Sequence, residues 1–161
     1  MELLKLDYWD KVPAEADVAT LEFLRTPCQP VKAVEDARPV IEAMRSWCVI
    51  NAASLAGLSA PQFGVGLRVC IVWLRGIEAV MINPEVVYEK GQQTGQEGCL
   101  SFPGVRVLVQ RPKIVKVRYL NEAGEQRSIK GHELTAVAIK HEVDHLDGKV
   151  IVDYLKGEGR R

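Results

Sequence analysis

The sequence predicts an α+β fold in which antiparallel strands pack around a helix. Apolar residues recur at three- and four-residue steps between Asp36 and Leu55 and again after Gly131, which is the spacing of an amphipathic helix. The stretch between them contains runs rich in β-branched and aromatic residues, bounded by Gly, Pro and Asn, as strands are. A helix, several strands and a second helix packed on them are typical of the α+β class.

Length and charge limit what the chain can be. Its 161 residues, 47% of them apolar, suit a single domain spanning 1–161. The 21 basic and 21 acidic side chains cancel, which argues against direct nucleic-acid binding and against binding to an anionic membrane. The longest apolar run, Val69 to Leu74, is far shorter than the roughly 20 residues of a membrane-spanning helix.

The N-terminus and the cysteines indicate a cytoplasmic protein. Residues 1–17 lack the basic and apolar regions of a secretory signal and carry several acidic side chains, which a mitochondrial transit peptide would avoid. Because the four cysteines form no CxxC pair, we expect free thiols rather than a disulfide framework. Three of them are expected to be small buried apolar side chains: Cys28, Cys48 and Cys70.

The elements of the first half are expected in this order. Residues 1–35 are expected to form a leading segment, of which 1–23 are largely irregular. One short helix is expected in it, at 14–25. The prolines of TPCQPV then impose extended backbone. The amphipathic helix then runs to Leu55. Gly57 and Pro61 stop it, so residues 57–66, GLSAPQFGVG, are expected to form a loop.

Strands are expected next, at 67–75, at 79–83 and, after the breaker Asn83-Pro84, at 85–89. In 113–120, KIVKVRYL, apolar and charged side chains alternate, and the turn 121–124 leads into a hairpin partner at 125–130. The second helix follows Gly131 and ends at Asp147-Gly148. VIVDYL at 150–155 is expected to be a final strand or extended segment, and no long C-terminal helix is expected.

The second helix carries HEVDH at 141–145. His141 and His145 are four residues apart, so both imidazoles lie on one face and reach a single metal ion. Glu142, beside the first histidine, lies within reach of a metal-bound water and can act as its base. The pattern predicts a metal centre on this helix; the alternative is a solvated helix face that carries these residues by chance.

A catalytic metal site usually has three protein ligands and an open position. The candidates for the third ligand are Cys99, a carboxylate or His132. His132 lies nine residues before His141, which is two and a half helical turns. It would therefore face away from the metal and lie more than two turns from it, so it is better explained as a helix-start or surface residue. Cys99 lies in QEGCLSF and its thiolate suits zinc or ferrous iron, although a buried apolar role is the alternative.

A polar amide also stands in the glycine- and proline-rich segment 57–64, GLSAPQFG. Gln62 offers two N–H donors that can stabilise negative charge on a carbonyl oxygen. An ordinary turn is the alternative interpretation.

Three segments in this order, AGLSAPQ, EGCLS and HEVDH, resemble the three motifs of the peptide deformylases, and the similarity extends from about Leu24 to Leu155. The resemblance implies that the metal ligands are Cys99, His141 and His145, with water or hydroxide in the fourth position. It implies also that Glu142 is the acid/base, that Gln62 and the backbone N–H of Leu100 polarise the formyl oxygen, and that Gly57 contacts the substrate.

The activity that the resemblance implies is hydrolysis of the N-formyl group from the initiator methionine of nascent polypeptides, with release of formate. The implied cofactor is one divalent ion, Fe²⁺ in the cell, with Zn²⁺, Ni²⁺ or Co²⁺ able to replace it. The expected partners are N-formylated nascent peptides, met at the ribosome exit, and a monomer is expected.

The sequence departs from the family pattern within the first motif. Leu55 stands where a glycine is common, and Ser59 replaces an alanine. Arg106 matches a position near the substrate backbone, and Asp144 either orients a ligand histidine or faces solvent. Small residues at positions that match the methionine pocket predict a roomier pocket with relaxed preference for the first residue; these positions are Ala56, Gly95, Leu134, Val137 and Ala138.

Three other functions compete with this one. A metallopeptidase that cuts internal bonds would take its third ligand downstream of the helix, where Glu158 alone could serve. A structural zinc module would need another Cys or His near Cys99, and none lies between Cys70 and His132. An inactive relative that binds formylated chains would retain the fold, and Leu55 leaves that alternative open.

Overall fold

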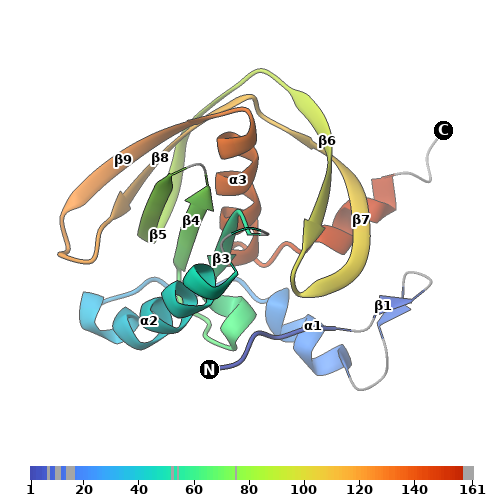
Figure 1. Cartoon of the computed structure of the whole chain (residues 1–161), viewed down its shortest axis with the longest axis horizontal. Coiled ribbons are helices and arrows are strands. Elements are labelled where there is room, and N and C mark those ends of the chain that lie inside the picture. The colour runs from blue at the N-terminus through green and yellow to red at the C-terminus, as the bar shows by residue number, and fades with distance from the viewer. Residues whose placement is uncertain are drawn as a thin grey trace.

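An antiparallel sheet, a separate β-hairpin and the helix between them form the frame of the molecule (Figure 1). The computed structural model describes residues 1–6, 8–9, 12–13, 17–51, 53, 55–74 and 76–157. The five-stranded sheet has the order β3-β4-β5-β8-β9, with every neighbouring pair antiparallel. Its strands are β3 (Gly57–Ser59), β4 (Val69–Leu74), β5 (Ile77–Lys90), β8 (Ile114–Leu120) and β9 (Gln126–His132).

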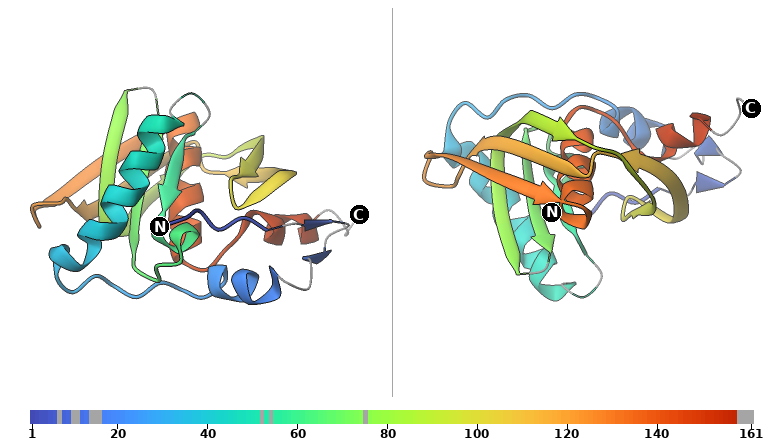
Figure 2. Two further views of the ribbon diagram at one scale, coloured as in Figure 1. Left: turned by 60° about the horizontal axis from the view of Figure 1, so that its bottom comes forward. Right: turned by 90° about the horizontal axis from the view of Figure 1, so that it is seen from above.

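The second sheet is the hairpin of β6 (Gln93–Cys99) and β7 (Phe102–Arg111). Helix α3 (Leu134–Leu146) lies between this hairpin and the larger sheet in all three views (Figures 1 and 2). The helix α2 (Val34–Ile50) covers the other face of the larger sheet. The remaining elements are α1 (Val18–Leu24), the short pair β1 (Tyr8–Trp9) and β2 (Val12–Pro13), and the 3-10 helices η2 (Ala60–Phe63) and η3 (Ile151–Gly157).

The core forms on both faces of the larger sheet because side chains of a strand alternate between them. In β4, Val69 and Ile71 belong to the cluster under α2, whereas Cys70 and Val72 belong to the cluster under α3. A third cluster joins η3 to the β6–β7 hairpin through Phe102 and its neighbours. Within the described residues, none of the helices combines the length and apolar character that a membrane-spanning segment requires.

The structure confirms the mixture of helices and antiparallel strands, including the alternating strand and hairpin turn at 113–130. The end of the second helix at Asp147 is also as predicted. The first helix lies within the predicted range, at Val18–Leu24, while 14–16 lie outside the described residues, as do Ala52, Arg75 and 158–161.

Several predicted boundaries were wrong. The helix expected to reach Leu55 ends at Ile50. The expected loop at 57–66 contains the strand β3 and the helix η2, because Ser59 and Gln62 form a reciprocal capping box. The two strands expected around Asn83-Pro84 are one strand, β5, in which Asn83 adopts a φ of 50° and the register with β8 shifts. VIVDYL is not a strand, since η3 spans most of it.

Candidate active site

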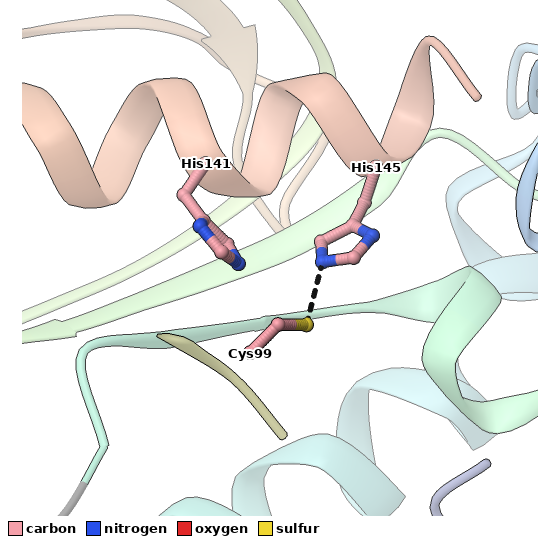
Figure 3. A group of neighbouring side chains, drawn as sticks. All are labelled: Cys99, His141 and His145. Atoms are coloured by element: carbon pink, nitrogen blue, oxygen red, sulfur yellow. Dashed lines mark hydrogen bonds between the residues drawn. The ribbon is translucent and has the colours of Figure 1, made fainter. Parts of the chain in front are cut away.

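Helix α3 and the end of β6 place three metal-ligating side chains together (Figure 3). His141 and His145 project from one side of α3, one turn apart, with ring centroids separated by 5.1 Å. Cys99 is the last residue of β6, and its Sγ lies 3.3 Å from Nε2 of His145. One ligand atom from each of the three residues lies within 4.8 Å of those of the other two.

This donor set fits a divalent metal ion. In a tetrahedral site with bonds of about 2.3 Å to sulfur and about 2.1 Å to nitrogen, the sulfur and nitrogen atoms are about 3.6 Å apart. The observed separation of Cys99 Sγ and His145 Nε2, 3.3 Å, is close to that value. One thiolate and two imidazoles suit zinc and ferrous iron. His132, the other histidine, is exposed at the end of β9 and outside the cluster.

The three ligands also influence one another's protonation. Burial alone would raise the pKa of the Cys99 thiol, but the charges and hydrogen bonds of His145 and His141 outweigh it and hold that pKa well below its ordinary value. Burial opposes the charged form of His141, yet Cys99 and Glu97 raise the pKa of this imidazole well above its usual range. The cluster therefore favours the thiolate, which is the form that binds metal.

A buried network behind the cluster orients His141. Glu97 accepts a hydrogen bond from Nδ1 of His141 at 3.0 Å and receives two from Arg111, at 2.8 and 3.0 Å. Arg111 also bonds to Asp144, whose Oδ2 accepts a hydrogen bond from the Tyr154 hydroxyl at 2.6 Å. Burial would raise the pKa of Glu97, but His141 and Arg111 lower it to about 2.

Two sequence-based expectations change here. Asp144 does not face solvent, because it is 4% exposed and bound to Arg111. The carboxylate that contacts a ligand histidine is instead Glu97, which sequence reasoning missed. The available signal was its place at the start of EGCLS, two residues before Cys99; in a strand this spacing places both side chains on the same face.

Glu142 packs closely against Gly57 of the first motif. Its side chain is 4% exposed, and its Oε2 has no hydrogen-bond partner among the described residues. Burial raises the pKa of this carboxyl to about 7, against the opposing charges of His141 and His145. A Cβ on Gly57 would lie 2.8 Å from Oε1 of Glu142 and 2.7 Å from the carbonyl oxygen of Ile71. Only a glycine at this position leaves room for the carboxylate.

The capping box of η2 fixes the orientation of the Gln62 amide. Ser59 donates to Oε1 of Gln62 from its backbone N–H at 2.9 Å and from its hydroxyl at 3.1 Å. Nε2 consequently faces the other way, 3.7 Å from Sγ of Cys99 and 3.3 Å from Oγ of Ser101. The Ser59 hydroxyl, one of the two departures in the first motif, thus helps to direct an amide donor toward the cluster.

Cys99, His141, Glu142 and Gln62 line one cavity of about 490 Å³ between β3, α3 and the β6–β7 hairpin, whereas His145 lies behind its wall. Its walls also include Leu55, the other departure from the family pattern, together with Trp47 and Lys5. Gly95 does not line the cavity, whereas Gln96 beside it does. The predicted substrate and oxyanion residues that do line it are Ala56, Gly57, Gln62, Leu100, Arg106, Leu134, Val137 and Ala138.

The remaining cysteines lie away from this cavity. Cys28, Cys48 and Cys70 are buried free thiols, as predicted, and none of them lines the cavity. Burial raises the pKa of Cys28 to about 11 and that of Cys48 to about 12, so both remain neutral side chains of the core.

The sequence of this chain is similar to those of known proteins over most of its length. The family model described as polypeptide deformylase matches residues 16–161. A peptide deformylase of Thermoanaerobacter pseudethanolicus is 42% identical over 133 residues, which cover 82% of this chain and 82% of that protein. A peptide deformylase of Acetivibrio thermocellus is 48% identical over 102 residues, covering 63% of this chain and 60% of its own.

Solved structures agree with the sequence relatives. The crystal structure of peptide deformylase from Thermotoga maritima superimposes with a TM-score of 0.78 at 28% identity, covering 96% of this chain and 98% of that one. The peptide deformylase of Synechococcus elongatus in complex with actinonin has a TM-score of 0.77 at 33% identity, covering 94% of this chain and 78% of its own. The similarity therefore extends over nearly the whole chain, not only over the three motifs.

Proposed function

The chain belongs to the peptide deformylase family, and we propose from this premise that the cavity is its catalytic centre. As a deformylase, the protein hydrolyses the N-formyl group of nascent peptides and releases formate. The observation that carries the site assignment is the convergence of three ligand atoms within 4.8 Å of one another beside a buried glutamate whose Oε2 has no hydrogen-bond partner among the described residues. In this proposal the ligands are Cys99, His141 and His145.

When bound, a divalent ion supplies Lewis acidity at the formyl oxygen and lowers the pKa of water at the site. Gln62 Nε2 donates to the oxygen that gains negative charge as the formyl carbon becomes tetrahedral, and Leu100 N–H provides the second donor. Glu142 accepts a proton from the attacking water and returns it to the amine nitrogen as the C–N bond breaks. Formate and a free N-terminal amine result.

The substrate backbone has a place between two strand edges. β3 is the outer strand of the larger sheet, and β6 pairs with β7 alone among the described strands. Gly57 of β3 and the end of β6, Gln96 to Cys99, both line the cavity. We propose that the formylated peptide lies here as an added strand, with Arg106 beside its backbone.

The pocket for the first side chain is proposed at Ala56, Leu134, Val137 and Ala138, which all line the cavity. Since these side chains are small or medium in size, relaxed preference for methionine remains our prediction. Comparing kcat/KM for formyl-Met, formyl-Leu and formyl-Phe peptides tests it, and a preference for methionine above about 100-fold would contradict it.

The metal, partners and domain organisation complete the proposal. We propose Fe²⁺ as the ion in the cell, with Zn²⁺, Ni²⁺ or Co²⁺ able to occupy the site, since a thiolate and two imidazoles accept all four. We propose further that the chain is a single catalytic domain built around the HEVDH helix, and that it works as a cytoplasmic monomer on nascent chains at the ribosome exit.

Formate release from formyl-Met-Ala-Ser by anaerobically prepared, iron-loaded protein tests the function. Glu142→Ala is expected to lower kcat by about 10²- to 10⁴-fold, because the proton acceptor is lost. Glu42→Ala is the matched control, since Glu42 is exposed on α2 and does not line the cavity. No turnover by the wild type would reject the deformylase activity, while normal turnover by Glu142→Ala would reject the assigned role of Glu142.

A further inference from the structure

The N-terminal segment 1–6 contacts the active site although it precedes the region matched by the family model, 16–161. The backbone N–H of Leu4 donates to the carbonyl oxygen of Gln62 at 2.7 Å, and that of Leu6 donates to the carbonyl oxygen of Ser101 at 2.9 Å. In Figure 2 (left) this dark blue segment runs from beside η2 toward the β6–β7 hairpin. The segment therefore connects η2, which carries Gln62, to the turn that follows Cys99 at the end of β6.

These contacts fix the position of Lys5. Leu6 is 1% exposed and Leu4 is half-buried, and both pack in the cluster that contains Cys99 and Phe102. Lys5 lies between these two anchored residues, is itself exposed, and lines the catalytic cavity. Because hydrogen bonds hold the backbone on both sides of it, Lys5 stays at the cavity wall, and its flexible side chain keeps the ammonium group within reach of the cavity.

The charges around the cavity are unevenly distributed. Of its carboxylates, Glu97 is bound to Arg111 and His141, and Glu142 is buried against Gly57. Lys5 and Arg106 are both exposed, and neither forms an ion pair within the part of the chain that the structure describes. The cavity thus presents two cations toward solvent, while its carboxylates are withdrawn.

We propose that Lys5 is a specificity-determining residue that favours formylated peptides with an acidic side chain after the first residue. The inference rests on the proposed function. A carboxylate near the ammonium of Lys5 gains a favourable interaction, and a lysine of the substrate is repelled. Exposed charge pairs change binding only by about two- to fivefold each, so attraction of one substrate and repulsion of the other together give about a 5- to 20-fold difference in kcat/KM.

The test uses three substrates and the iron-loaded enzyme at low ionic strength. The peptides are formyl-Met-Asp-Asp-amide, formyl-Met-Asn-Asn-amide and formyl-Met-Lys-Lys-amide, whose amide ends remove the terminal carboxylate. The wild type is expected to prefer Asp over Lys by about 5- to 20-fold, through KM rather than kcat, and to lose most of the preference in 0.5 M salt, where the Debye length is only a few ångström.

Substitutions at position 5 identify the source of the preference. Lys5→Gln is expected to reduce it several-fold, Lys5→Glu to abolish or invert it, and Lys5→Arg to retain it. Lys116→Glu is the matched control, because Lys116 is exposed on β8 and does not line the cavity, and it is expected to leave the preference unchanged.

Each result has a defined meaning. Equal kcat/KM for the three peptides in the wild type, or a preference that survives Lys5→Glu, would overturn the role of Lys5. An equal loss of preference in Lys116→Glu would overturn it as well, since a general charge effect would then explain the data. Failure to hydrolyse even the Asn peptide would contradict the proposed function instead.

Discussion

Replacing Arg111 by methionine is expected to destabilise the protein severely. Arg111 is 4% exposed and lies between two buried carboxylates, Glu97 at 8% and Asp144 at 4% exposure. Methionine fills much of the volume but removes the cation, so two carboxylates are left buried without their partner. Breaking a buried ion pair in this way costs about 3–5 kcal/mol, a large part of the 5–15 kcal/mol that typically stabilises a domain.

The assay is urea and thermal unfolding of the metal-free and metal-saturated forms, since metal binding adds its own stabilisation. A loss of about 3–5 kcal/mol corresponds to a fall in Tm of about 6–20 °C for a domain of this size. Arg118→Met is the control, because Arg118 forms a salt bridge with Glu85 in which the two side chains are 51% and 62% exposed. That substitution should cost less than about 1 kcal/mol. Equal losses in the two variants would refute the argument that burial makes the Arg111 network important.

Four further predictions concern the cavity and the core. Gly57→Ala should lower kcat by about 10- to 100-fold, since its Cβ would displace Glu142. Gly95→Ala is the control and should leave kcat unchanged, because the space around the added carbon is open. The rate of formate release measures kcat for both variants. Ser59→Ala should lower kcat by about 2- to 10-fold with little change in KM, because one hydrogen bond to Gln62 is lost, and exposed Ser46 provides a Ser→Ala control. Thiol titration of the native metal-free protein at pH 8 should label Cys99 alone, because burial raises the pKa values of the other three thiols. Because these pKa values exceed the ordinary thiol value of 9.0, the three thiols contribute their full stability below pH 9. That contribution is lost as pH rises through about 11 to 12, where Cys28 and Cys48 ionise, and urea midpoints at pH 8 and pH 11 measure the loss.

Elements whose own side chains show a clear period could be predicted from the sequence. In β8, Val115 and Val117 are buried while Lys116 and Arg118 are exposed, so alternation alone identifies the strand. The β6–β7 hairpin escaped prediction because β6, QTGQEGC, contains two glycines and little apolar surface. Pairing with β7 along its length stabilises it, and local propensity does not reveal such pairing.

Residues that usually break helices and strands caused the wrong predictions of secondary structure in the first motif and in β5. Gly57 and Pro61 normally interrupt regular structure. Here the glycine leaves room for Glu142 at the edge of β3, and the proline lies in the first turn of the 3-10 helix that carries Gln62. Asn83 bridges its break by adopting a positive φ and bonding through its side chain to the backbone of Val31, 52 residues away. Contacts of this range are absent from any local pattern.

The same distinction explains which parts of the site the sequence could reveal. His141, Glu142 and His145 are fixed by helical spacing, so one turn of α3 is enough to place them. The orientation of each depends on residues far along the chain: Glu97 holds His141, and Gly57 admits Glu142. Lys5 is the extreme case, since its position depends on hydrogen bonds to the carbonyl groups of Gln62 and Ser101. Short-range spacing therefore specifies which chemistry the cavity performs, whereas contacts between residues far apart in the sequence govern how accurately it is positioned and which charges the substrate meets.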